Sequence, residues 1–427
     1  MKMKNTFIWA TLFVAQIMGS MVYGKVLDVL SPDKNIKVSI ELKDKIYYSI
    51  FFHDDVLLNN CTLGMTLPKE VLGANPVLEN AQEGTVDETR RREIPLKNAL
   101  VRNHNNYLRM DMAGNYAVEF RVFDDGVAYR FITDRKKRLE VIDEEFNINF
   151  SSDYRAYVGE AHAFSTSYES VYTRLQTESY GADDIMTYLP ALLEHPDGYK
   201  ILISEADLVD YPCMFLKSTG NNGMHALFPK CPVRFEDDND YKLKIVEEAP
   251  YIAKTSGERN FPWRFFVIAK HEKTLVENEM VYKLSAPCEL EDYSWVTPGK
   301  SSWEWWNPSL YNVGFRVGSN TQTYKYYVDF AANMGLEYML MDGAWMAAAS
   351  DPWTPNPEIN LPEVIQYAMQ RNVKVLLWLS WLTVEKHFDQ LFARYAMAGI
   401  SGLKIDFMER SDQWMVNYYE RVAAEAA

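Results

Sequence analysis

Cysteine and positive charge are scarce in this chain. Its 427 residues contain only four cysteines, and no Cys-x-x-Cys spacing occurs, so neither a zinc site nor a thiol-redox motif is indicated. Acidic residues outnumber basic residues by 59 to 44, and the net charge of -15 argues against a nucleic-acid partner, which would need a basic face. A disulfide between Cys213 and Cys231 and a set of free buried thiols are both compatible with these cysteines.

Long hydrophobic runs are also rare, and the one that stands out is at the N-terminus. Lys2 and Lys4 precede a mostly apolar run from Phe7 to Met21, and residues 22–24 then resemble a cleavage site. We therefore predict that residues 1–24 are a secretory signal peptide. Because no second run follows, we expect no membrane span after its removal, and a secreted, periplasmic protein.

Residues 25–290 have the texture of an antiparallel β-domain. Apolar and polar residues alternate with period two over several short segments separated by turn residues, among them Asn35–Leu42, Ile46–Phe52 and Tyr116–Phe123. Many short strands and few helical stretches predict a large β-sandwich. Such a domain can bind ligands or support a neighbouring catalytic domain.

Strands and helices alternate in residues 291–427, after a boundary at Thr297-Pro298-Gly299. We expect strands over Ser302–Trp306, Glu337–Met341, Val373–Leu379 and Leu403–Asp406, and helices over Thr321–Asn333, Leu361–Arg371, Val384–Ala398 and Asp412–Ala426. Repeated βα units predict a parallel sheet with crossover helices. The chain lacks the glycine-rich phosphate loop of flavodoxin-like folds, which favours a TIM-type barrel.

A complete (β/α)8 barrel needs about 250 residues, and roughly half that length follows Gly299. We therefore expect residues 291–427 to be the first half of an α/β barrel whose remaining units lie beyond Ala427.

Asp406 ends the fourth expected strand, where loops of parallel barrels build active sites. A carboxylate there suits a nucleophile or a base. The alternative is that Asp406 only caps the next helix.

All but two of the 11 tryptophans lie from Trp295 onward. Aromatic faces stack on sugar rings, so tryptophans beside carboxylates indicate a carbohydrate site, although a large aromatic core explains them equally well.

A second acidic cluster follows the expected strand Lys200–Ile203. Glu205, Asp207 and Asp210 lie within six positions, and hard cations such as calcium take several oxygen ligands. The alternative is a solvated turn.

Several motifs, in this order along the chain, resemble glycoside hydrolase family 97. They are Trp303-Glu304-Trp305-Trp306-Asn307, the helix of residues 320–332, Asn360-Leu361-Pro362-Glu363-Val364, residues 373–378, and Gly402-Leu403-Lys404-Ile405-Asp406-Phe407-Met408. The resemblance spans nearly the whole chain after residue 24. It implies an N-terminal β-super-sandwich, a (β/α)8 catalytic barrel, and an exo-acting, calcium-dependent hydrolase of oligosaccharides or other α-glycosides.

The resemblance also implies roles for individual residues. Asp406 stands where retaining members carry their nucleophile, and the glutamate acid/base would lie beyond Ala427. Glu205 matches a calcium ligand. The residues matching substrate-binding positions are Trp303, Asp342, Trp345 and Lys404. The sequence departs from the family pattern Asp-Glu-Gly-Trp at residues 342–345, which read Asp-Gly-Ala-Trp, and this leaves the sugar open.

Three functions follow from these observations. The leading interpretation is a retaining α-galactosidase with Asp406 as nucleophile. The second is an inverting α-glucosidase, and the third is a non-catalytic glycan-binding protein.

Overall fold

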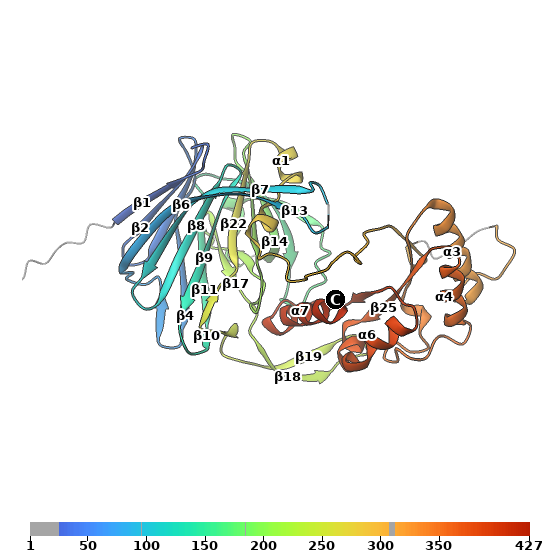
Figure 1. The fold of residues 1–427 in the computed structure, drawn as a ribbon. Helices are drawn as coiled ribbons and strands as arrows, with labels where there is room; N and C mark the ends of the chain where they lie inside the picture. Colours follow the sequence, from blue (N-terminus) through green and yellow to red (C-terminus); the bar gives the residue numbers. More distant parts are fainter. Residues whose placement is uncertain (1–24, 95, 184, 307–311) are drawn as a thin grey trace, which may run out of the picture.

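The structure is a computed structural model, and it describes residues 25–94, 96–183, 185–306 and 312–427. It has a β-rich part, coloured blue to yellow in Figure 1, and a parallel αβ part, coloured orange to red. The expected signal peptide at residues 1–24 lies outside the described residues. In the part of the chain that is described, no helix is both long and apolar enough to cross a membrane.

The N-terminal part is mostly strand, as predicted. Its strands are β1 (Lys25–Leu30), β2 (Ile36–Leu42), β3 (Ile46–Phe52), β4 (Asp55–Leu67), β5 (Glu70–Leu72), β6 (Leu78–Arg91), β7 (Leu100–Met112), β8 (Tyr116–Phe123), β9 (Gly126–Asp134), β10 (Leu139–Val141), β11 (Asp143–Asn149), β12 (Arg155–Ala161), β13 (Tyr172–Gln176), β14 (Met186–Glu194), β15 (Lys200–Ala206), β16 (Phe215–Ser218), β17 (Gly223–Leu227), β18 (Pro232–Asp237), β19 (Leu243–Glu248), β20 (Ala253–Thr255), β21 (Glu258–Asn260) and β22 (Trp263–Ala269). Short helices η1 (Thr177–Ser179), α1 (Glu272–Val276) and α2 (Met280–Leu284) accompany them.

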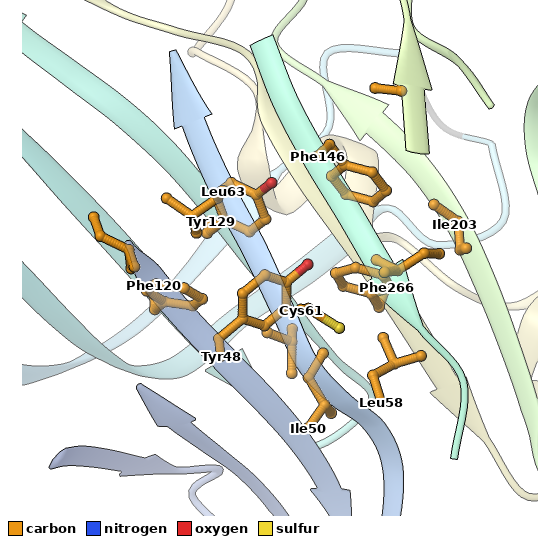
Figure 2. Close-up of a cluster of buried hydrophobic side chains, with 14 of the residues drawn as sticks. Tyr48, Ile50, Leu58, Cys61, Leu63, Phe120, Tyr129, Phe146, Ile203 and Phe266 are labelled. Carbon is orange, nitrogen blue, oxygen red and sulfur yellow. The ribbon is translucent and has the colours of Figure 1, made fainter. Parts of the chain in front are cut away.

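One 18-stranded antiparallel sheet folds into two facing layers. Tyr48 on β3 contacts Phe120 on β8 and Tyr129 on β9, with ring centroids 5.8 and 5.6 Å apart. Phe146 on β11 stacks on Phe266 on β22 at 5.8 Å. Figure 2 shows these rings meeting in the core between the layers. Burial alternates residue by residue along β2 and β3, which confirms the period-two prediction there.

The C-terminal part contains a parallel sheet in the order β23 (Ser301–Trp303), β24 (Tyr338–Met341), β25 (Lys374–Ser380) and β26 (Gly402–Asp406). Its helices are α3 (Thr321–Met334), η2 (Gly343–Trp345), α4 (Leu361–Met369), α5 (Trp381–Lys386), α6 (Phe388–Met397) and α7 (Gln413–Ala426). Strands in chain order with helices between them match the predicted parallel topology. Closure into a barrel stays a prediction.

The helix ends follow local capping chemistry. The side chains of Asn320 and Asn360 accept hydrogen bonds from the first turns of α3 and α4, and Gly335 ends α3 in the left-handed conformation at φ 67°. The expected helix Val384–Ala398 was right in its C-terminal part, α6, but not in its start or continuity. Helix α5 starts directly after β25, where Ser380 caps it, and α6 begins after a break at His387.

The first expected parallel strand, Ser302–Trp306, was too long. Strand β23 ends at Trp303, and the next three residues form a turn. Glu304 at this turn accepts a hydrogen bond from the backbone N–H of Asp342, so its side chain joins the turn to the end of β24.

The β-rich part contacts the parallel part at the start of α7. Asp210 accepts hydrogen bonds from the side chains of Gln413 and Asn417, at 2.6 and 2.8 Å. The backbone N–H of Cys213 donates to the carbonyl of Ser411 at 2.9 Å. The four cysteines are all free thiols, so Cys213 and Cys231 form no disulfide.

Candidate active site

The carboxyl ends of the four parallel strands bring together residues that are far apart in sequence. Strand register pairs Trp303 with Leu340, Met341 with Leu377, and Ser380 with Asp406. Because parallel strands end at one edge of a sheet, the residues at these ends share one edge. Three predicted site residues, Asp342, Lys404 and Asp406, are in contact there.

Asp406 is held by three hydrogen-bond donors. Its Oδ2 accepts from the indole Nε1 of Trp378 at 2.9 Å and lies 3.2 Å from Nζ of Lys404, and its Oδ1 accepts from the N–H of Phe407 at 2.8 Å. Partial burial raises the pKa of Asp406, but these three donors outweigh it, and the pKa is lowered overall. The side chain is 36% exposed. Asp406 is therefore an ionised carboxylate with an open side at neutral pH, as a nucleophile requires.

Asp406 does not cap the following helix. Asp412 caps α7, since its side chain accepts from the N–H of Met415 at 3.1 Å. Asp412 also binds Arg410 through two hydrogen bonds of 2.8 and 3.0 Å. The capping alternative for Asp406 was wrong, and the geometry leaves its carboxylate available for a ligand.

Lys404 links the two carboxylates. Its Nζ lies 3.3 Å from Oδ2 of Asp342 and 4.4 Å from the centre of the Trp303 ring. Trp303 in turn donates from Nε1 to Oδ2 of Asp342 at 2.7 Å. One ammonium group between two carboxylates offsets their mutual repulsion and orients both.

Glu304 adds a third carboxyl group, to which the sequence analysis gave no role. Its Oε1 accepts from the hydroxyl of Tyr324 and from the N–H of Asp342, both at 2.8 Å. Burial is the main cause that raises the pKa of Glu304, with the nearby charge of Asp342 adding to it. Among the described residues, its buried Oε2 has no hydrogen-bond partner. Glu304 thus anchors the backbone from which the Asp342 side chain projects.

The tryptophans divide into exposed and buried groups. Trp305 and Trp306 are 62% and 77% exposed, and their rings stack near that of Trp303, with centroids 5.4 and 6.0 Å away. Trp345 is only 1% exposed and donates from Nε1 to the carbonyl of Trp378 at 2.9 Å. Trp345 therefore packs behind the edge and supports the residue that holds Asp406, so direct contact with substrate stays a prediction.

Glu205 lies on β15 in a buried charge cluster, and not in a solvated turn. Both its oxygens accept from the N–H of Met214, at 3.1 and 3.2 Å, and Oε2 also accepts from Arg264. Arg264 is completely buried and makes two further hydrogen bonds of 2.8 Å to Glu144. Burial is the main cause that raises the pKa of Glu205 to about 7, although Arg264 opposes it.

The described residues alone do not complete a calcium site at Glu205. Calcium takes roughly six to eight oxygen ligands, and residues 25–94, 96–183, 185–306 and 312–427 hold no group of three or more His, Cys, Asp or Glu side chains that could bind a metal. Both oxygens of Glu205 are already hydrogen-bonded, one of them to a guanidinium group that would repel a cation. The calcium role of Glu205 therefore stays a prediction.

Sequence reasoning missed the residues that act through long-range contacts. Trp378 was seen as part of an apolar strand, and Arg264 is 59 positions from Glu205. Period-two alternation could have found Trp378, because Leu376, Trp378 and Ser380 lie on one face of β25. No local signal identifies Arg264 as the partner of Glu205.

Two protein-family models match the chain. The family model described as Glycosyl-hydrolase 97 N-terminal matches residues 29–287, and the model described as Glycoside hydrolase 97 matches residues 303–427. A protein named retaining alpha-galactosidase from Bacteroides thetaiotaomicron (strain VPI-5482) is 35% identical over 422 residues, which cover 94% of this chain and 63% of that relative. A probable retaining alpha-galactosidase from Streptomyces bingchenggensis is 25% identical over 327 residues, covering 75% of this chain and 46% of the relative.

Solved structures share the fold. A glycoside hydrolase family 97 enzyme from Pseudoalteromonas sp. strain K8, in complex with acarbose, superposes with a TM-score of 0.79 at 23% identity, covering 94% of this chain and 64% of that one. A beta-arabinopyranosidase gives a TM-score of 0.74 at 19% identity, covering 94% and 65%. The chain therefore spans a little under two thirds of the length of these structures and of the Bacteroides relative.

Proposed function

The chain belongs to glycoside hydrolase family 97, and we propose on that premise that it is an exo-acting, retaining hydrolase of α-galactosides. The observation that carries the proposal is Asp406, an ionised and partly open carboxylate at the end of β26, held by Trp378, Phe407 and Lys404. The choice of sugar is supported by the 35% identical relative, whose name is retaining alpha-galactosidase.

The proposed reaction has two steps. Asp406 attacks the anomeric carbon, and the bond to the leaving oxygen breaks as a carboxylic acid protonates that oxygen, which leaves a galactosyl ester on Asp406. Water then attacks the same carbon, the conjugate carboxylate removes its proton, and Asp406 is released. Two inversions give net retention. The acid lies about 5–5.5 Å from the nucleophile in such enzymes, and we assign no described residue to that role.

The residues around Asp406 are suited to holding a sugar ring. In this proposal Lys404 donates to sugar hydroxyls and Asp342 accepts from them, since both polar groups are at the same edge as Asp406. Trp303 fixes Asp342 through its indole N–H, and the residue is partly exposed. These contacts supply orientation, which lowers the barrier by holding the anomeric carbon in line with Asp406.

Three further expectations from the sequence remain proposals for this chain. They are a complete (β/α)8 barrel, a secreted or periplasmic location, and a requirement for calcium. No step above passes through a metal ion, because the described residues do not form a calcium site. Calcium dependence is checked by measuring hydrolysis after chelation and after calcium is added back, and full activity in the chelated protein would refute it.

The proposed specificity has a direct test. We expect protein expressed from its complete gene to hydrolyse an aryl α-galactoside with a kcat/KM at least about tenfold above that for the matching α-glucoside, because a site that hydrogen-bonds a sugar hydroxyl discriminates against the epimer. The measurement is the rate of aryl-group release from the α-galactoside and from the α-glucoside, with the aryl β-galactoside as control. Preference for the glucoside would favour the α-glucosidase interpretation, and binding without hydrolysis would favour a glycan-binding protein.

A further inference from the structure

A hairpin of the β-rich part reaches the loop that follows Asp406. Strands β18 and β19 pair with each other in a two-stranded sheet of their own, separate from the large sheet. Figure 1 shows this hairpin projecting from the β-rich part toward α6 and the parallel sheet. Its turn spans residues 238–242 and carries the contacts described next.

Two residues of the hairpin touch the loop. The ring of Tyr241 lies 5.1 Å from the ring of Phe407 and 6.1 Å from that of Trp378. Nζ of Lys242 forms an ion pair with Oε2 of Glu409 at 2.5 Å. Phe407 and Trp378 are also two of the three residues that donate hydrogen bonds to Asp406.

Two residues of this loop have an unfavourable backbone conformation. Phe407 and Glu409 have φ angles of 64° and 43°, in the left-handed region that residues with a Cβ disfavour. The N–H of Phe407 donates to Oδ1 of Asp406 at 2.8 Å, and its direction is set by the peptide plane that joins these two residues. A shift of the loop that rotates this peptide plane would break the hydrogen bond and leave the carboxylate free to rotate.

Other contacts fix the same loop to the β-rich part. The N–H of Thr166 donates to the carbonyl of Glu409 at 3.0 Å, and the N–H of Cys213 donates to the carbonyl of Ser411 at 2.9 Å. The loop of residues 407–411 is therefore restrained from three separate segments of the β-rich part. A strained backbone conformation persists only where contacts from the surrounding structure hold it in place.

We propose that Tyr241 and Lys242 are positioning residues, through which the hairpin holds Phe407 and Glu409 and thereby fixes the orientation of Asp406. The effect on catalysis rests on the proposed function, whereas the effect on the loop does not. The β-rich part then contributes to the chemical step without touching the reacting atoms. A role confined to overall stability would leave kcat unchanged once the protein is folded.

The test uses variants Tyr241→Ala and Lys242→Ala, with Lys244→Ala as the matched control. Lys244 is exposed on β19, two positions from Lys242, and has no ion-pair partner among the described residues. The side chain of Lys242 is 42% exposed, so its removal leaves no buried cavity. Tyr241→Phe keeps the ring that contacts Phe407 and serves as the conservative variant.

Two readouts are measured on protein from the complete gene. Hydrogen exchange of the amides in residues 407–411 is expected to quicken about tenfold in Tyr241→Ala and Lys242→Ala, because the restraint on local opening is weakened. On an aryl α-galactoside, kcat is expected to fall about tenfold to a hundredfold with KM nearly unchanged. A reacting group that is displaced by about 1 Å lowers the rate of the chemical step by up to this factor. Tyr241→Phe and Lys244→Ala should match the wild type in both readouts.

The outcomes separate this inference from the proposed function. If the wild type is inactive and the loop amides of both variants still exchange faster than those of the wild type, the proposed function is refuted and the positioning role is supported. An active wild type whose variants keep both kcat and loop exchange would overturn the positioning role. Faster exchange spread evenly over the whole chain would also overturn it, because the hairpin would then only stabilise the fold.

Discussion

Asp406→Asn is expected to lower kcat/KM on an α-galactoside by about 10^4-fold or more, which is the size of effect seen when a nucleophile is removed. The amide retains an oxygen that can accept from Trp378 or from the N–H of Phe407, so the surrounding structure has little cause to change. The amide is too weak a nucleophile to form the ester. Steady-state kinetics and a thermal melt of the same sample measure both effects.

Asp389→Asn provides the matched control for this substitution. Asp389 lies exposed in the first turn of α6, so the same chemical change there should leave both kcat and the melting temperature close to those of the wild type. Asp406→Gly with added azide extends the test, because azide can attack the anomeric carbon from the vacated face and give a β-galactosyl azide. Full activity in Asp406→Asn would remove Asp406 from the mechanism.

Arg264→Met is expected to destabilise the β-rich part by about 3–5 kcal/mol, the usual result of removing one partner from a buried charge pair. Arg264 is completely buried and hydrogen-bonds both Glu144 and Glu205. Methionine fills part of the space but leaves two buried carboxylates without a counter-charge. Chemical denaturation measures the change in the free energy of unfolding.

Arg102→Met is the comparison for Arg264→Met. Arg102 makes two hydrogen bonds of 2.8 Å to Asp87, but its side chain is 60% exposed, and water replaces the lost contacts. We expect little change in its melting temperature. An equal loss of unfolding free energy in the two variants would show that the buried cluster contributes no more to stability than an exposed ion pair.

Glu205→Gln tests the same cluster through pH. The pKa of Glu205 is raised to about 7 from an ordinary 4.5, so the folded state binds this proton more tightly than the unfolded state. Its contribution to wild-type stability is therefore complete below pH 4.5 and is lost as pH rises to 7. Glutamine cannot ionise, so the variant should gain stability relative to wild type between pH 5 and pH 8, by on the order of 3 kcal/mol. A difference that stays constant with pH would contradict the raised pKa.

The parts of the fold that sequence predicted well are governed by local chemistry. Asn320, Asn360 and Gly335 set helix ends through capping and a left-handed residue, and alternation along β2 and β3 reports a half-buried sheet. The break at His387 was missed because Ser380 starts a new helix directly at the end of a strand, and apolar periodicity continues across the break.

The grouping of Asp342, Lys404 and Asp406 was predictable, because all three lie at the carboxyl ends of strands in one parallel sheet. The site was not predictable where a role depends on packing. Tryptophan is a residue type that stacks on sugar rings, but Trp345 is buried behind Trp378. The contacts of Tyr241 with Phe407 join segments more than 160 positions apart, and no local pattern encodes such a pairing.

In the proposed reaction Asp406 forms a covalent bond to the sugar, with net retention at the anomeric carbon. Proton NMR of an aryl α-galactoside, recorded during the first minutes of hydrolysis by protein from the complete gene, identifies the anomer that is released first. We expect α-galactose to form first and the β-anomer to appear later, at the rate of mutarotation. Initial release of the β-anomer would mean a single displacement by water and would contradict Asp406 as the nucleophile.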